Sequence, residues 1–335
     1  MKSILKIIST ILFCALSLGA LAQDANSLVK EGIELNNARN YTGAIEKYKA
    51  ALTLEPANIN ANYQIAFSLN ALGKGSDALP YLQNVVEGNA SANIMAASYG
   101  LMGSIYDKLS QAQKSVDSYK LAIKADSTDH SMYYNLGLAY FRNRQYAEAE
   151  QSAIAAIGLK PDHAASIRLY ALVTFHQNKR MPALLALCHF LWLEPTGAKN
   201  DEAYTNLQSI LKGGELKAGQ TSGTVSADTR ELNQAITTVV AGANNKKYPT
   251  PATLLSEQLK AIFAAAGNLA KKQTGGSLLY NKLVNRYYKL AQTGNMPAFA
   301  NYISQANDKG AAAFVKTKSA SITALDAWVK EQGVL

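Results

Sequence analysis

Small residues recur along this sequence at a nearly constant spacing, and that recurrence limits the possible fold more than any other feature. One column consists of Gly32, Ala66, Gly103, Gly137 and Ala171, and a second consists of Ala44, Ala78, Ser115, Ala149 and Ala183. In both columns the successive members are 34, 37, 34 and 34 residues apart. A fixed period of roughly 20 to 50 residues is typical of chains built from stacked supersecondary units. The sequence therefore predicts five repeats of one structural unit.

Each repeat is predicted to be a hairpin of two helices. Polar or glycine-containing segments at 37–41, 73–76, 143–145 and 178–180 separate the two columns, as turns would. Large apolar residues at helical spacing surround the small ones, and Pro56, Pro161 and Pro195 stop three of the second helices. Two antiparallel helices come close only where side chains are small. We therefore expect each hairpin to close at its glycine, alanine or serine positions.

The fourth unit has the most specific pattern, which consists of Tyr133, Tyr134, Asn135, Leu136, Gly137, Tyr140, Ala149, Ala156 and Pro161. With this set the chain resembles the tetratricopeptide repeat family. The resemblance implies an all-α fold, in which a solenoid of helical hairpins is followed by a helical C-terminal region. The five units cover 25–58, 59–92, 96–129, 130–163 and 164–197, or roughly half the chain.

Three units depart from the family pattern. The second and third units carry Ala90 and Ser127 in place of the terminal proline, and we expect the loop at 88–95 between them to hold three extra residues. In the fifth unit Thr174 and Phe190 replace an aromatic and a small residue. These replacements favour contact between the fifth unit and the C-terminal half rather than another repeat.

The second half is predicted to begin with a helix and a flexible linker at 198–230, because 212–230 contains little apolar surface to bury. A helical C-terminal domain should follow at 231–335. Apolar residues there return at helical spacing in 231–240, 253–269, 278–290, 297–303 and 312–329. The part at 287–302 looks like one divergent hairpin of the same kind.

The first 22 residues are predicted to be a signal peptide. Lys2 and Lys6 precede an apolar run at 7–18, and small residues follow it up to Ala22, after which we expect cleavage. The run is shorter than the roughly 20 residues that span a bilayer, so we expect no transmembrane segment in the mature chain. The protein should be exported to the periplasm or the extracellular space. Cys188 is then the one remaining cysteine, which excludes a disulfide within the mature chain.

Residues that carry chemistry are sparse. The chain has four histidines, and no acidic residue or second cysteine stands at ligand spacing beside His176 and His189, which lie in the same unit. Cys188 lies in an apolar helix typical of a core position. The run at 73–77 lacks the full phosphate-loop pattern and a preceding strand. We therefore expect no catalytic residue, no cofactor and no metal, and we predict that the chain is not an enzyme. An enzyme with an unfamiliar helical catalytic domain is the third hypothesis.

The function we favour is a scaffold that holds a partner protein or peptide in a concave groove, in envelope assembly or transport. When hairpins stack, the first helices line the concave wall. The residues predicted to face the groove are Lys30, Tyr63, Gln64, Phe67, Asn70, Tyr134, Asn135, Phe141, Arg168 and Phe175. Amide side chains can pair with a peptide backbone, and aromatic rings can cover its side chains. Ordinary solvated or packing roles are an equally good reading for any single one of them.

Charge suggests an alternative function. Residues 23–197 contain 15 Lys and Arg against 15 Asp and Glu, whereas residues 198–335 contain 16 against 9, a net charge of +7. The basic half could bind anionic envelope material such as polysaccharide or lipid head groups. Spread-out lysines that merely keep the domain soluble are the simpler explanation, since no tight basic cluster occurs. We expect no nucleic-acid partner, because basic and aromatic residues alternate only around Tyr287 and Tyr288.

Overall fold

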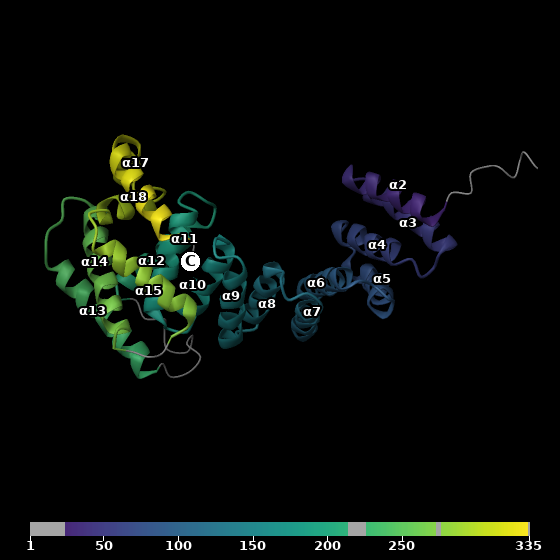
Figure 1. Cartoon of the computed structure of the whole chain (residues 1–335), viewed down its shortest axis with the longest axis horizontal. Helices are drawn as coiled ribbons and strands as arrows, with labels where there is room; N and C mark the ends of the chain where they lie inside the picture. Colours follow the sequence, from purple (N-terminus) through teal and green to yellow (C-terminus); the bar gives the residue numbers. More distant parts are fainter. Residues whose placement is uncertain (1–23, 214–225, 273–275, 334–335) are drawn as a thin grey trace, which may run out of the picture. The chain divides into compact units, whose positions relative to one another are not determined.

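The computed structural model describes residues 24–213, 226–272 and 276–333. Within these residues the chain forms helices joined by turns and contains no strand, which confirms the expected all-α fold (Figure 1). The predicted signal peptide and part of the predicted linker lie outside the described residues. The helices are α2 (Ala25–Asn37), α3 (Tyr41–Leu54), α4 (Ile59–Ala71), α5 (Gly75–Glu87), α6 (Ala92–Lys108), α7 (Ala112–Ala125), α8 (His130–Arg142), α9 (Tyr146–Leu159), α10 (Ala164–His176), α11 (Arg180–Leu193), α12 (Asn200–Leu211), α13 (Ala227–Asn244), α14 (Pro251–Ala270), α15 (Leu278–Ala291), α16 (Met296–Ser304), α17 (Lys309–Thr317) and α18 (Ser319–Gln332).

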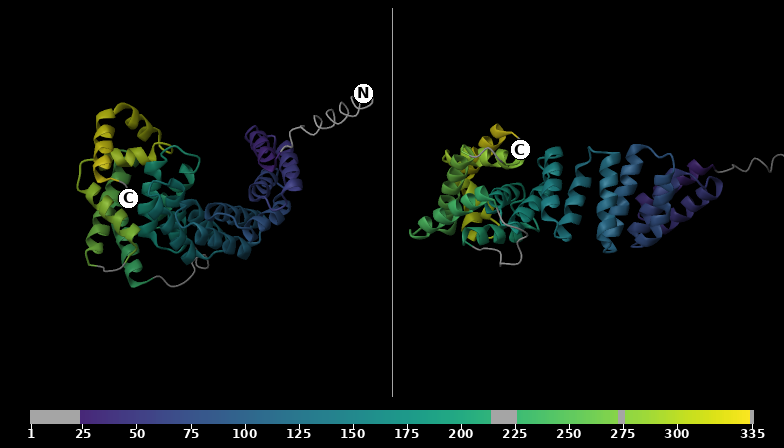
Figure 2. Two further views of the ribbon diagram at one scale, coloured as in Figure 1. Left: turned by 45° about the vertical axis from the view of Figure 1, so that its right-hand side comes forward. Right: turned by 90° about the horizontal axis from the view of Figure 1, so that it is seen from below.

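The chain divides into two compact units, of which unit 1 ends at Asp126 and unit 2 begins at Ser127. Unit 1 contains three hairpins, α2–α3, α4–α5 and α6–α7 (Figures 1 and 2). Unit 2 contains the hairpins α8–α9 and α10–α11 together with α12–α18. Each predicted repeat is thus one helical hairpin. The predicted domain limits at 197 and 230 stay predictions, because a division into compact units does not test independent folding.

The hairpins close where the sequence placed its small residues. All ten members of the two columns are buried. A Cβ atom added to Gly32 would lie 2.3 Å from the ring of Tyr48 in the facing helix, and one added to Gly103 would lie 2.9 Å from the ring of Tyr119. The Ser115 hydroxyl donates a 2.9 Å hydrogen bond to the Gly103 carbonyl, so the one polar member of the columns is satisfied across the hairpin. The predicted helix register is therefore confirmed.

The turn inside each hairpin has the same backbone geometry in all five repeats. One residue per turn has a positive φ: Arg39, Gly73, Ser110, Arg144 and Asn178, with φ between 55° and 75°. The N–H of the next residue donates to the carbonyl five residues earlier, over 2.8 to 2.9 Å. This is the hydrogen bond of a Schellman motif, which satisfies a carbonyl that the helix end would leave free. A shared turn geometry gives the five hairpins the same shape.

Three boundaries differ from the prediction. The extra residues between the second and third repeats do not form a loop that reaches residue 95. They lengthen α6, which begins at Ala92, directly after its N-cap residue Ser91. Helix α13 begins at Ala227, inside the predicted linker, because the Ser226 hydroxyl accepts a hydrogen bond from the Thr229 N–H. The segment 312–329 is not one helix, since Lys318 has non-helical φ and ψ and separates α17 from α18. No glycine or proline marks that break.

The C-terminal region covers the last hairpin, as predicted from Thr174 and Phe190, the two residues of the fifth repeat that differ from the family pattern. Helix α11 packs against α12, α13, α15 and α16, and nearly all of its residues are buried, including Cys188, whose pKa burial raises. The expected hairpin at 287–302 does not form, because α15 and α16 each pack mainly on α14. Phe263, Tyr287 and Phe299 meet there with ring centroids 4.7 to 6.2 Å apart. This aromatic core replaces helix pairing with packing around α14.

Candidate protein-binding face

The ten predicted groove residues all lie on first helices, and most share equivalent positions in different repeats. Tyr63, Tyr134 and Arg168 form one set, Lys30, Gln64 and Asn135 a second, and Asn70, Phe141 and Phe175 a third, while Phe67 has its own position. Among the first helices, α2 contacts α4, α4 contacts α6, and α8 contacts α10. Neighbouring second helices contact each other less. First helices therefore lie on the inside of the local curvature in each unit. We call the solvent-facing surface of the first helices the first-helix face.

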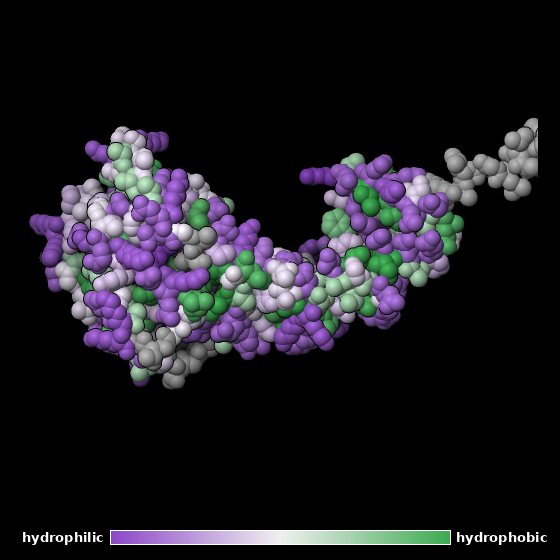
Figure 3. All heavy atoms as spheres, in the orientation of Figure 1, coloured by the Kyte–Doolittle hydropathy of each residue, from purple (hydrophilic) through white to green (hydrophobic). Residues whose placement is uncertain are grey.

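In unit 1 this face is a mixture of amide, aromatic and basic side chains. Lys30 is exposed, Phe67 is 44% exposed, and Gln64 is half-buried. Tyr63 packs partly against the core of the second and third hairpins, and burial raises the pKa of its hydroxyl. Asn70 accepts a 3.2 Å hydrogen bond from Lys108 of the next first helix. In Figure 3 hydrophobic residues reach the surface between hydrophilic ones. Of the five predicted residues, Phe67 offers a partner the most apolar surface.

In unit 2 the face is an aromatic wall. The Tyr134 ring lies edge-on to His163 at 5.4 Å, and His163 meets His130 at 4.7 Å. The His176 ring stacks on Tyr146 at 5.3 Å and contacts Phe141 at 5.2 Å.

Phe175 also touches His176, with 6.2 Å between the ring centroids, while Asn135 is half-buried. Burial lowers the pKa of both His163 and His176. At neutral pH these two rings are therefore uncharged, and they extend the apolar surface. Sequence reasoning missed both histidines, although His176 directly follows the predicted Phe175 in the sequence.

Arg168 is less available than predicted, because it is already paired. Its Nη1 lies 3.3 Å from Glu202 Oε2, and Glu202 belongs to α12, directly after the last repeat. The ion pair holds Arg168 along the face instead of leaving it free to meet a partner. Only the folded chain could show this, since the two residues are 34 positions apart.

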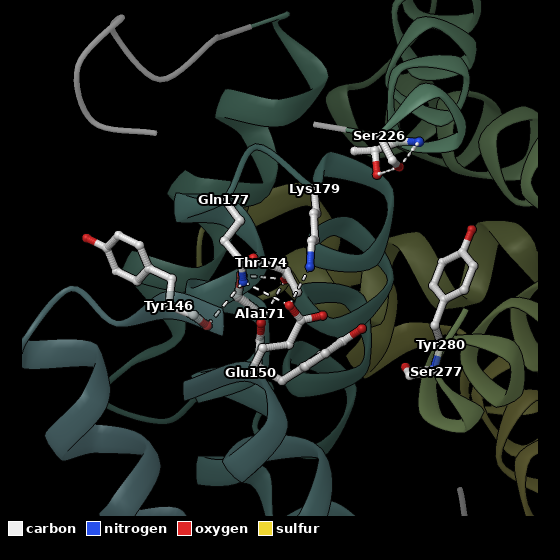
Figure 4. Close-up of polar contacts among 11 residues, drawn as sticks. Tyr146, Glu150, Ala171, Thr174, Gln177, Lys179, Ser226, Ser277 and Tyr280 are labelled. Atoms are coloured by element: carbon white, nitrogen blue, oxygen red, sulfur yellow. Dashed lines mark hydrogen bonds and ion pairs between the residues drawn. The ribbon is translucent and has the colours of Figure 1, made fainter. Parts of the chain in front are cut away.

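A group of polar side chains joins the fifth hairpin to the fourth (Figure 4). Glu150 of α9 is nearly buried and accepts hydrogen bonds from Gln177 at 2.9 Å and Lys179 at 2.5 Å, both in the turn between α10 and α11. Tyr170 is buried beside it, and its pKa is raised by burial and by the Glu150 charge. A nearly buried carboxylate with two satisfied partners is structural here, because it joins α9 to the turn between α10 and α11.

The described residues contain no group of three His, Cys, Asp or Glu side chains that could hold a metal ion. Among the same residues no helix has the length and apolar character needed to cross a bilayer.

Comparison with known families gives a match in the middle of the chain. The tetratricopeptide repeat model matches residues 96–129 and 130–163, which are the predicted limits of the third and fourth repeats. No curated protein matches the sequence.

Solved structures to which this chain is similar include the following three. A crystal structure of the MamA protein has 20% identity and a TM-score of 0.43, and the match covers 62% of this chain and 100% of that one. YrrB, described as a tetratricopeptide repeat protein with an unusual peptide-binding site, has 16% identity and a TM-score of 0.49, with 57% and 97% covered. Pseudomonas aeruginosa pilF has 15% identity and a TM-score of 0.43, with 77% and 95% covered. Similarity at this level carries no information on function.

Proposed function

Since residues 96–163 match the tetratricopeptide repeat model, we propose that the chain is a non-catalytic scaffold that binds a partner protein or peptide on its first-helix face. The observation that carries the proposal is the set of partly exposed aromatic and amide side chains at equivalent positions of α4 in unit 1 and of α8 and α10 in unit 2. An extended peptide offers backbone amides and side chains in alternation. In unit 1, Gln64 and Asn70 can pair with the former and Phe67 can cover the latter; in unit 2, Asn135 and Tyr134 offer the same two kinds of contact.

Two matched variants of the full chain test this proposal. Phe67→Ser removes the exposed aromatic ring from the first-helix face of unit 1. Leu54→Ser removes a side chain of similar exposure, 55% against 44%, from the end of the second helix α3. Partners captured from native cell extract are identified by mass spectrometry and quantified for each variant. A partner retained by Leu54→Ser and lost by Phe67→Ser supports the proposal, and equal capture by both variants excludes this part of the face.

We further propose that the scaffold is exported and acts in envelope assembly or transport. The basic and apolar composition of residues 1–22 supports export, as does Cys188 being the one cysteine after them. N-terminal sequencing of the protein from its native source should begin at Gln23. A mature chain that begins at Met1 and stays in the cytoplasm would contradict this proposal.

A second candidate function is binding of anionic envelope material by the basic half. It is favoured by Lys246, Lys247, Lys260 and Lys282, which are exposed and form no ion pair within the described residues. The full chain should then bind vesicles that contain anionic lipid more tightly than neutral ones, and added salt should weaken that binding because it screens exposed charges. Replacing the four lysines with glutamine should abolish the difference, and an unchanged preference would exclude this candidate.

A further inference from the structure

Unit 2 contains a cavity that takes no part in the first-helix face. Its volume is about 320 Å³, and it is lined by residues of α11, α15 and α18 and of the turn between α9 and α10. The lining includes His189, Trp192 and Leu193 from α11, Arg286 from α15, and Val329 and Lys330 from α18. Small-molecule sites typically occupy about 300 to 1,000 Å³ and combine apolar walls with a few converging polar groups. The cavity has this composition at the small end of the range.

Arg286 is the principal charge in the cavity. It is half-buried, and burial lowers the pKa of its guanidinium group. The guanidinium donates a hydrogen bond to the Gly333 carbonyl at the end of α18, and within the described residues it has no carboxylate partner. A guanidinium has five N–H donors, and withdrawing its charge from water without a counter-ion is unfavourable. A carboxylate in the cavity would supply that counter-ion, and it could accept two parallel hydrogen bonds.

His189 is the buried polar group of the cavity. Its side chain is 4% exposed, and burial together with the Arg286 charge lowers its pKa to about 3, so the ring is neutral at neutral pH. Its Nδ1 lies 3.4 Å from the Tyr287 hydroxyl, which leaves Nε2 for a ligand. Burial raises the pKa of Tyr287, so that group is also uncharged. Neither residue neutralises Arg286.

The rest of the lining provides apolar walls and a second positive charge. The Trp192 ring is held by Tyr302 at 4.5 Å and by Phe299 at 6.2 Å, so it presents a fixed surface. Lys330 is exposed at the rim. Asp162 also lines the cavity, but it is exposed and forms no ion pair with Arg286 or Lys330 among the described residues. The polar end of the cavity is therefore positive and its walls are hydrophobic.

We propose that this cavity binds the carboxylate of an apolar ligand, with Arg286 as the charge partner and His189 as a hydrogen-bonding neighbour. Trp192, Leu193 and Val329 would enclose the apolar body of the ligand. The same chemistry is offered by a small free carboxylic acid and by the C-terminus of a peptide. The site is independent of the first-helix face, so either proposal can fail without the other.

Tryptophan emission of the full chain tests the proposal directly. The chain has 2 tryptophans, of which Trp192 lines the cavity and Trp328 lies on α18 next to Val329. The probes are hexanoate, hexanamide, and the dipeptide acetyl-alanyl-leucine as free acid and as amide. Saturable changes with the acids and none with the amides are expected. Tighter binding of the dipeptide acid identifies a peptide C-terminus as the source, tighter hexanoate binding identifies a free acid, and no saturation with either acid overturns the proposal.

Two variants of α15 separate ligand binding from mere attachment of α18. Arg286 bonds the Gly333 carbonyl, and Lys289 bonds Gln332 Oε1 at 3.4 Å, but only Arg286 lines the cavity. Arg286→Gln should weaken binding of the acid probe by about tenfold or more, because a charge-assisted hydrogen bond is lost. Lys289→Gln should leave binding unchanged, and an equal loss in both variants would overturn the proposal. If circular dichroism shows that Arg286→Gln does not fold, the exposed Lys330→Glu replaces it, and unchanged binding in that variant would also overturn the proposal.

Discussion

In the first column of small residues, whether a position holds glycine or alanine is related to the size of the side chain that it meets in the second helix of the hairpin. Gly32 and Gly103 face the rings of Tyr48 and Tyr119. Ala66 and Ala171 have Leu82 and Leu187 at the same offset of 16 residues along the sequence. An aromatic ring needs the space of a missing Cβ, whereas leucine accommodates alanine. Four of the five hairpins follow this pairing, whereas the fourth has Ala153 at that offset from Gly137, whose added Cβ would lie 2.8 Å from Leu169 of α10.

This pairing predicts a rescue. Gly32→Ala should cost about 1 to 3 kcal/mol through overpacking, because the buried Tyr48 ring lies 2.3 Å from the new Cβ. In a Tyr48→Leu background, which copies the Ala66 and Leu82 pair, the same change should cost clearly less. Gly158→Ala is the control, since nothing lies within 4 Å of its Cβ, and it should gain up to about 1 kcal/mol from helix propensity. Urea unfolding of the four variants measures these differences, and additive costs would refute the pairing.

The repeated turn predicts opposite signs for two substitutions at one equivalent position. Arg144 has φ 59°, a left-handed conformation that is unfavourable for a residue with a Cβ, whereas Gly73 has φ 75°. Arg144→Gly should stabilise the protein by a few tenths to about 1 kcal/mol, and Gly73→Ala should destabilise it by about 1 kcal/mol or more. Thermal unfolding checks both. A loss of stability in Arg144→Gly would mean that its side chain contributes more than the backbone strain costs.

Between elements, Asn233 of α13 hydrogen-bonds the C-terminal region to the turn of the last hairpin. Its Oδ1 accepts a 3.0 Å hydrogen bond from the Arg180 N–H, and its Nδ2 donates a 2.8 Å hydrogen bond to the Asn178 carbonyl. Both backbone groups belong to the turn of the fifth hairpin and its second helix. One side chain thus completes the backbone hydrogen bonding of an element 53 to 55 residues away.

Removing this side chain should destabilise unit 2 specifically. Asn233→Leu leaves a backbone donor and a backbone acceptor unpaired, which should cost about 1 to 3 kcal/mol. The neighbouring Gln234 is exposed, so Gln234→Leu should change stability by less than about 0.5 kcal/mol. Amide hydrogen exchange should show faster exchange in α11 and α13 of the Asn233 variant and unchanged exchange in α2–α5. Equal effects of both substitutions would place the attachment elsewhere.

At the scale of the whole molecule, sensitivity to acid should belong to unit 2. All four histidines follow residue 127, and burial lowers the pKa of His163, His176 and His189, the last to about 3. Unfolding returns these groups to the ordinary value of 6.5. Between the two values the unfolded state binds more protons than the folded state, so stability is complete above about pH 7 and falls as the pH decreases towards 3.

The expected slope is at most about 1.4 kcal/mol per pH unit for each histidine that must take up a proton. Both tryptophans lie in unit 2, so urea unfolding followed by tryptophan emission at several pH values between about 5 and 7.5 reports on that unit. His189→Gln should reduce the slope, because glutamine does not titrate. A midpoint that does not change over this range would contradict the buried, neutral state of His189.

The sequence by itself determined the helical hairpins of the repeat region, their register and their turns. These follow from short-range physics, since small residues at a fixed period set where helices touch, and glycine, proline and polar runs set where they stop. The same reasoning placed the ten candidate residues on first helices, because a helix face follows from spacing alone. Helix limits inside the second half were approximate, and the break at Lys318 has no local signal.

Tertiary structure decided everything that depends on residues far apart in the chain. The Arg168–Glu202 pair, the histidine rings beside Tyr134 and Phe141, the packing of α15 and α16 on α14, and the Arg286 cavity all join segments whose meeting no local pattern encodes. A single sequence records which side chains are available, but the free energy of each such contact depends on which helix packs beside it. Those neighbours are fixed only when the whole chain has folded.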